Sequence, residues 1–334
     1  MTAPLALTGP LLLFGGPYSN LEATRAVLAE AERRQIPPER IVCTGDVVAY
    51  GADAKATVDL VRASGLRVVM GNCEEALSVG AADCGCGFAP GSDCERLSAA
   101  WFAHADRQLD ADARAWMASL PRRLDVELAG LALAVVHGSV TEINHFVFAS
   151  TPDRVKALDL ALSGVDGIIA GHCGLPFTQV IQDRLWHNPG VVGVPANDGT
   201  PRVWFSILTP GPEPRTLVIE HLTLVYDYVT AAVKMRAAGL PEGYAEALVS
   251  GLWPSCDVLP SQEAKAQGVS LKAGKLIWRR EGLTATVAEH LGWPVETVSP
   301  PAQLDPGRFC DQVLIATTSS RVDPISPWTE LQVP

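Results

Sequence analysis

The stretch "LLLFGGPYSNLEATRAVLAEA" (residues 11–31) joins an apolar run to a helical pattern through a turn rich in glycine and proline. Residues 11–14 are all apolar and end at Gly15-Gly16-Pro17, which is typical of a short buried strand. After Asn20, apolar residues recur at helical spacing and predict a helix over 21–34. The stretch therefore predicts a strand, a tight turn and a helix, the first unit of an α/β fold.

The same unit repeats along the chain, so we expect right-handed crossovers and a parallel sheet in the N-terminal part. The predicted strands lie at 41–44, 67–70, 123–128, 131–136 and 167–170, and the predicted helices at 54–64, 149–163, 229–238 and 242–250. Residues 178–225 predict an antiparallel set of strands. From about residue 254, prolines are frequent and periodicity is weak. We therefore expect one domain over 1–255 and a C-terminal extension over 256–334, whose role the sequence does not disclose.

Composition limits the classes of protein to consider. The chain has 334 residues, is 48% hydrophobic and carries a net charge of −11, so it can bury a full core. An acidic surface argues against a protein that coats nucleic acid or an anionic membrane, although local groups could still bind a small phosphorylated molecule. Without a long apolar run or a basic leader, we expect a cytoplasmic protein with no membrane segment. The sequence leaves open whether the protein forms a homo-oligomer.

Four short motifs each follow a predicted strand: "TGDVVAYG" (44–51), "MGNCEE" (70–75), "VVHGS" (135–139) and "AGHCGLPF" (170–177). Loops at the carboxyl ends of strands meet at one edge of a sheet, where open α/β sheets bind ligands. The motifs offer one carboxylate, one amide and two imidazoles, a mixed set that suits Zn, Mn or Fe; these side chains belong to Asp46, Asn72, His137 and His172.

Each of these residues alone has a simpler structural reading. Asp46 could cap the following helix, and Asn72 could hold a turn. A single histidine at a strand end is usually a hydrogen-bonded structural group. Because all four occur at successive strand ends, the set favours a metal site.

The order GD, GN, HG, GH resembles the calcineurin-like metallophosphoesterase superfamily, particularly its small bacterial and archaeal phosphodiesterase branch. The segments "NLEATRAVL" (20–28), "NPGVVGVP" (188–195) and "GLPEGYAEALVSG" (239–251) extend the likeness over about residues 10–255. The resemblance implies an α/β fold, a four-layer αββα sandwich, with a two-metal site at the sheet edge. It also implies hydrolysis of a small phosphate ester or anhydride.

The chain departs from this pattern in its first and last motifs. The family's first motif reads Asp-x-His-Gly-Asn, whereas residues 16–20 read GPYSN; its last reads Gly-His-x-His, whereas residues 171–174 read GHCG. Three of the four ligands of the first metal are therefore replaced, and the fourth, Asp46, normally bridges both metals. The second site of Asp46, Asn72, His137 and His172 is complete. We interpret the departures as a rebuilt centre with one or two transition-metal ions (Mn, Fe or Zn).

Other side chains could complete such a centre. Tyr18 stands where the resemblance expects a histidine, and a phenolate can bind ferric iron. Thiols near a cation lose their protons and bind soft or borderline metals, although a buried cysteine or a redox pair is the alternative reading; the candidates are Cys73, Cys84, Cys86, Cys94 and Cys173. The start of the helix after residue 20 favours anions and predicts a phosphate-side loop, formed by Gly15, Gly16, Ser19 and Asn20.

Two functions remain open from the sequence. The first is a metal-dependent phosphoesterase-like hydrolase that acts on a small phosphorylated molecule, with Asp46, Asn72 and His137 at the reacting centre. The second is a non-hydrolytic metal or thiol redox enzyme, sensor or binding protein built on the same scaffold. The intact second site favours the first function, and the replaced ligands favour the second.

Overall fold

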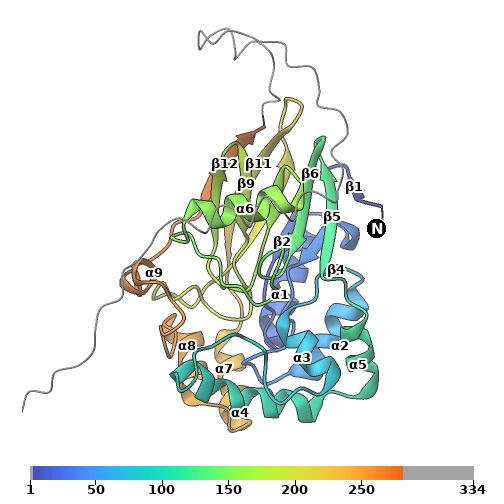
Figure 1. Cartoon of the computed structure of the whole chain (residues 1–334). Coiled ribbons are helices and arrows are strands. Elements are labelled where there is room, and N and C mark those ends of the chain that lie inside the picture. The colour runs from blue at the N-terminus through green and yellow to red at the C-terminus, as the bar shows by residue number, and fades with distance from the viewer. Residues whose placement is uncertain (1–2, 281–334) are drawn as a thin grey trace, which may run out of the picture. The chain divides into compact units, whose positions relative to one another are not determined.

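The computed structural model describes residues 3–280, which contain two six-stranded sheets (Figure 1). The first sheet has the order β1 (Leu5–Leu7), β5 (Arg123–Leu128), β6 (Leu131–Val136), β7 (Gly167–Ile169), β9 (Arg184–Asn188) and β8 (Phe177–Ile181). The second has the order β12 (Gly274–Arg279), β11 (Thr216–Leu224), β10 (Val203–Pro210), β2 (Leu11–Phe14), β3 (Ile41–Cys43) and β4 (Arg67–Val68).

Helices cover the outer faces of both sheets. One core cluster joins the second sheet to α1 (Leu21–Arg33), α2 (Ala54–Ser64), α3 (Asn72–Val79), α4 (Asp93–Gln108), α5 (Ala111–Ala118), α7 (Tyr228–Ala237) and α8 (Glu242–Ser250). A separate cluster packs α6 (Asp153–Ser163) on the first sheet, where Figure 1 shows it lying across the strands. The remaining pieces are a 3₁₀ turn at Pro38–Arg40 and α9 (Ser261–Lys265). The predicted four-layer αββα sandwich is confirmed.

The opening strand explains why the layers form. Leu12 and Phe14 belong to the cluster shared with the helices, whereas Leu11 and Leu13 belong to the cluster between the two sheets. Successive side chains of a strand point to opposite faces, so a strand buried on both faces must be apolar throughout. The run LLLF satisfies this condition, and all four residues are fully buried.

Most predicted elements are confirmed, several to the residue, but three need correction. The helix expected from residue 149 begins at Asp153, because Pro152 disfavours helical backbone in the residue before it. The strand expected over 67–70 pairs only at 67–68. The antiparallel set at 178–225 is two hairpins in different sheets, β8–β9 and β10–β11, so each sheet mixes parallel and antiparallel pairs.

Residues 256–280 add α9 and the edge strand β12 to the described fold. β12 pairs antiparallel with β11 over Gly274 to Arg279, and its Trp278 is buried between the sheets. The rest of the expected extension lies outside the described residues, and the boundary at 255 stays a prediction. No described helix combines the length and apolar character that a membrane crossing requires.

The inter-sheet core provides a test of stability. Leu133→Ala removes a fully buried side chain from β6 and should lower the free energy of unfolding by about 2–5 kcal/mol. Leu158→Ala makes the same chemical change on the exposed face of α6, where the side chain is 59% exposed, and should change it by no more than about 0.5 kcal/mol. Equal losses in urea unfolding would contradict the assigned core.

Candidate metal centre

The four predicted ligands come from the ends of strands in both sheets. Asp46 follows β3 and Asn72 begins α3, both on the side of the second sheet, whereas His137 follows β6 and His172 follows β7 of the first sheet. One short contact between the two sides is the hydrogen bond that His137 Nδ1 donates to the Thr44 carbonyl oxygen at 2.6 Å. The site therefore lies where the carboxyl ends of the two sheets meet.

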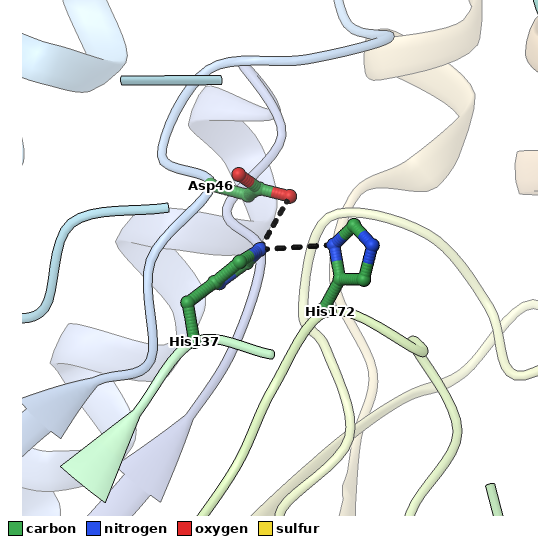
Figure 2. Close-up of side chains that lie close together, drawn as sticks. All are labelled: Asp46, His137 and His172. Atoms are coloured by element: carbon green, nitrogen blue, oxygen red, sulfur yellow. Dashed lines mark hydrogen bonds and ion pairs between the residues drawn. The ribbon is translucent and has the colours of Figure 1, made fainter. Parts of the chain in front are cut away.

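Three side chains converge on His137 Nε2, and Figure 2 shows two of them, Asp46 and His172. This nitrogen lies 3.0 Å from Asn72 Oδ1, 3.1 Å from His172 Nδ1 and 3.2 Å from Asp46 Oδ2. The ligand atoms of Asp46, His137 and His172 all lie within 4.8 Å of one another, and the three residues are buried. The structure thus brings together all four residues that the motifs predict.

The hydrogen bonds around the cluster leave lone pairs pointing inward. Because His137 Nδ1 donates to Thr44, Nε2 of the neutral ring carries a lone pair. Asn72 Nδ2 donates to the Cys84 carbonyl oxygen at 2.8 Å, which turns Oδ1 toward the histidines. Asp46 can only accept. With the His137 ring neutral, these acceptors repel one another, and a cation among them, either a metal ion or a proton taken up by His137 Nε2, relieves the repulsion.

The second nitrogen of His172 bears on which atom could bind an ion. His172 Nε2 is buried near the backbone of Cys86 and Asn144 and forms no well-aligned hydrogen bond among residues 3–280. A proton on Nε2 would leave the lone pair of the neutral ring on Nδ1, which lies 3.1 Å from His137 Nε2. In that tautomer the ring could bind a metal ion through Nδ1.

Burial and the short distances shift the ionisation of the cluster. Burial opposes a charge on His137, but the Asp46 carboxylate outweighs it and raises the pKa of the imidazole. Burial and the neighbouring His137 lower the pKa of His172 to about 3. Burial raises the pKa of Asp46, yet His137 lowers it further, so the net shift is downward. At neutral pH the cluster therefore holds a carboxylate beside a neutral His172.

The backbone of two of the ligands is strained. Asp46 has φ of 57° and His172 has φ of 59°, in the left-handed region that non-glycine residues rarely adopt. Close packing requires a glycine beside them, because a Cβ at Gly71 would lie 2.2 Å from Asp46 Oδ1. Such strain persists only where the surrounding structure holds it, and it concentrates at functional sites.

Glu74 is a site residue that the sequence analysis missed. Its carboxylate is fully buried and accepts from the backbone N–H groups of Asp46 at 2.8 Å, Gly71 at 2.9 Å and Val48 at 3.2 Å. These bonds attach the turn that contains Asp46 to the first turn of α3, where Glu74 lies. Burial and the nearby Asp46 raise the pKa of Glu74. The signal was present in the sequence, since glutamate at the third position of a helix is half of a capping box.

Tyr18, Cys73 and Cys173 lie around the cluster as buried, un-ionised groups. The Tyr18 ring packs edge-on against Tyr50 with centroids 4.8 Å apart, and burial raises its pKa well above the ordinary value. Burial also raises the pKa of Cys73 and brings that of Cys173 to about 12. The Cys173 thiol accepts from Asn188 Nδ2 at 3.1 Å. Their roles as ligands stay predictions.

The insertion after α3 carries a disulfide that touches the site. The sequence predicts thiols at Cys84 and Cys86, whereas the structure joins them to each other. Asn72 Nδ2 lies 3.4 Å from Cys86 Sγ as well as bonding to the Cys84 carbonyl, so this loop orients the Asn72 amide. Cys94 is buried in the first turn of α4, where burial raises its pKa.

The predicted phosphate-side loop is held by contacts within the protein. The amides of Gly15, Gly16 and Ser19 donate to carbonyl oxygens of neighbouring loops. Asn20 caps α1 through Ala23 N. The Ser19 hydroxyl is buried and has no hydrogen-bond partner in the described part of the chain. A contact from this loop to phosphate stays a prediction. The Ser19 hydroxyl is the group of this loop that could donate a hydrogen bond to it.

Comparison with known proteins decides the family. The sequence profile of the calcineurin-like phosphoesterase superfamily domain matches residues 19–209, more than half of the chain.

The chain belongs to the calcineurin-like phosphoesterase superfamily.

Individual proteins resemble the chain in sequence or in fold. An uncharacterized protein of Methanocaldococcus jannaschii is 27% identical over 251 residues, which cover 70% of this chain and 95% of that protein. A metallophosphoesterase from Sphaerobacter thermophilus has a similar structure, with a TM-score of 0.56, 24% identity, and coverage of 74% of this chain and 100% of that one. A hypothetical protein from Pyrococcus horikoshii has a TM-score of 0.59 at 15% identity, and the match covers 73% of this chain and 99% of that one. These structural likenesses concern the fold.

The convergence on His137 predicts which histidines hold metal. His172→Ala removes one of the donor atoms and should abolish retention of manganese, measured by elemental analysis after gel filtration. His104→Ala is the matched control, because His104 bonds to the Ala52 carbonyl at the edge of α4 and lies outside the cluster. Unchanged metal content in the His172 variant would show that the cluster does not bind the ion.

Glu74 should act on the metal site by positioning Asp46. In Glu74→Gln one of the two accepting oxygens becomes an N–H₂ group, so the backbone N–H of Val48, or those of Asp46 and Gly71, would face a donor and the turn must shift. We expect manganese affinity to fall by about 10–100-fold, as for other residues that orient ligands. Glu75→Gln, whose carboxylate pairs with Arg122 at the surface, should leave affinity unchanged. Wild-type affinity in both variants would remove Glu74 from the site.

Proposed function

We propose that the chain is a metal-dependent phosphoesterase that hydrolyses a small phosphate ester or anhydride with a single ion held by Asp46, Asn72, His137 and His172. The family assignment supports the class of reaction. The observation that carries the proposal is a buried cluster of four potential donor atoms for a cation: Asp46 Oδ2, Asn72 Oδ1, His172 Nδ1 and His137 Nε2, with the other three at 3.0–3.2 Å from Nε2.

The donor set fits a transition metal that binds nitrogen and oxygen. One carboxylate, one amide oxygen and two neutral imidazoles suit Mn, Fe or Zn. The set carries one negative charge, from Asp46, so a site filled by a divalent ion keeps a net positive charge that attracts phosphate. When bound, the ion supplies a Lewis acid and water activated for attack near neutral pH.

The surrounding residues position the donors and exclude solvent. Thr44 holds the His137 ring through its carbonyl oxygen, and Glu74 holds the turn of Asp46. The ring of Phe146 packs on His172 with centroids 4.0 Å apart and covers one side of the cluster. Fixed donors in a dry site interact more strongly with charge than the same groups in water.

A second function is favoured by the Cys84–Cys86 disulfide. Its contact with the Asn72 amide places a pair of bonded cysteines beside the candidate metal centre. This arrangement would suit a metal and thiol redox protein or sensor. Iron with visible charge-transfer bands and no phosphatase turnover in the purified protein would support this function instead.

Turnover and metal content together test the primary proposal. The protein reconstituted with manganese should hydrolyse 4-nitrophenyl phosphate, lose activity on chelation and regain it when manganese is restored. Asp46→Asn keeps the shape but removes the only charge of the donor set, and should lower kcat/KM by at least about 100-fold. Asp125→Asn, in a part-exposed ion pair with Arg123 on β5, serves as control. Metal-loaded protein without turnover of phosphate esters would refute the hydrolase.

A further inference from the structure

One feature that this mechanism does not use is an aromatic pocket beside the candidate metal centre. His172 forms part of its wall, so the pocket borders the cluster on the His172 side. Six aromatic side chains from distant segments line it: Tyr18, Tyr50, Phe88, Phe146, Tyr244 and Trp253. Aromatic rings with hydrophobic neighbours are the usual lining of small-molecule sites.

The pocket has no charged lining. None of its lining residues, all within the described part of the chain, is a lysine, arginine, aspartate or glutamate. A phosphate group buried there would have no cation to balance it, and burying an unpaired charge is costly. The charged part of a substrate therefore belongs at the cluster of Asp46 and the histidines, and the pocket suits an uncharged part.

Two aromatic rings of the pocket lining, those of Tyr18 and Trp253, occupy the space where two expected metal ligands would lie. A Cβ at Gly16 would lie 2.4 Å from Cζ of Tyr18, and one at Gly174 would lie 3.3 Å from the Trp253 ring. These are the positions at which the resemblance to the family expects an aspartate and a histidine. Aromatic rings now fill the space beside both glycines, so the side of the cluster toward Tyr18 and Trp253 is apolar.

The size of the pocket sets the size of its ligand. Its enclosed volume is about 70 Å³, about half of the ~150 Å³ of a cavity that holds one benzene ring. The pocket is also partly open to solvent. It therefore encloses a compact group, and a six-membered ring would be enclosed on one side and extend through the opening.

We propose that this pocket binds the uncharged organic group of the substrate, so that the protein acts on phosphate esters of an aryl or compact alkyl alcohol rather than on polyphosphates. The inference rests on the proposed hydrolase function and specifies its substrate class. The ester oxygen would lie between the cluster, which takes the phosphate, and the rings of Tyr18 and Trp253, which take the organic group.

Binding to the metal-free protein tests the pocket without any hydrolysis. 4-Fluorophenol should broaden its ¹⁹F line on addition of the protein, and Trp253→Ala should abolish the effect whereas Trp253→Phe retains it. Trp116→Ala is the matched control, because Trp116 is a half-buried tryptophan of α5 that does not line the pocket. Absence of broadening with the folded wild type, or equal loss in both alanine variants, would overturn the inference.

Substrate preference then tests the role of the pocket in turnover. With manganese bound, kcat/KM for phenyl phosphate should exceed that for methyl phosphate, and Trp253→Ala should reduce this ratio by about tenfold without changing metal content. Equal rates for the two esters would refute the pocket assignment while leaving the hydrolase intact. Binding of 4-fluorophenol with no turnover of either ester would instead refute the hydrolase.

Discussion

The contact between His137 and Thr44 is the constraint on which the rest of the candidate site depends. It crosses from the end of β6 in the first sheet to the end of β3 in the second and is only 2.6 Å long. Because it commits the proton of the ring to Nδ1, it leaves Nε2 as an acceptor among other acceptors. In the neutral ring this assignment makes the cluster a site that favours a cation, and the contact also sets the position of the site between the two sheets.

Buried hydrogen bonds offset the unfavourable free energy of bringing these groups together. Asp46 and His172 keep left-handed backbone, and Glu74 lies fully buried beneath the Asp46 turn. Each of these features is unfavourable alone, but three backbone donors satisfy the Glu74 carboxylate and Asp46 is tied to α3 through Cys73 N at 3.2 Å. The site is thus held by the start of one helix and the ends of the strands. Such preorganisation is what a ligand set needs to hold an ion in one geometry.

Much of this could be predicted from the sequence because strand ends are visible in it. Short apolar runs that end at glycine located β2, β3, β6 and β7, and therefore the edge at which Asp46 and His137 meet. The partition of residues 178–225 into two sheets could not be predicted, since periodicity shows that strands alternate but not which sheet they join. Glu74 was missed because an acidic residue after "GNC" also fits an exposed helix start. The Cys84–Cys86 bond depends on loop geometry that spacing alone does not determine.

The most direct test is anomalous diffraction from crystals of the protein grown with manganese. The account predicts one anomalous peak per chain, within bonding distance of Asp46, Asn72 Oδ1, His137 Nε2 and His172 Nδ1, and none beside Gly16 and Gly174. A cluster without a peak at saturating manganese, or a second ion in the space now taken by Tyr18 and Trp253, would contradict it.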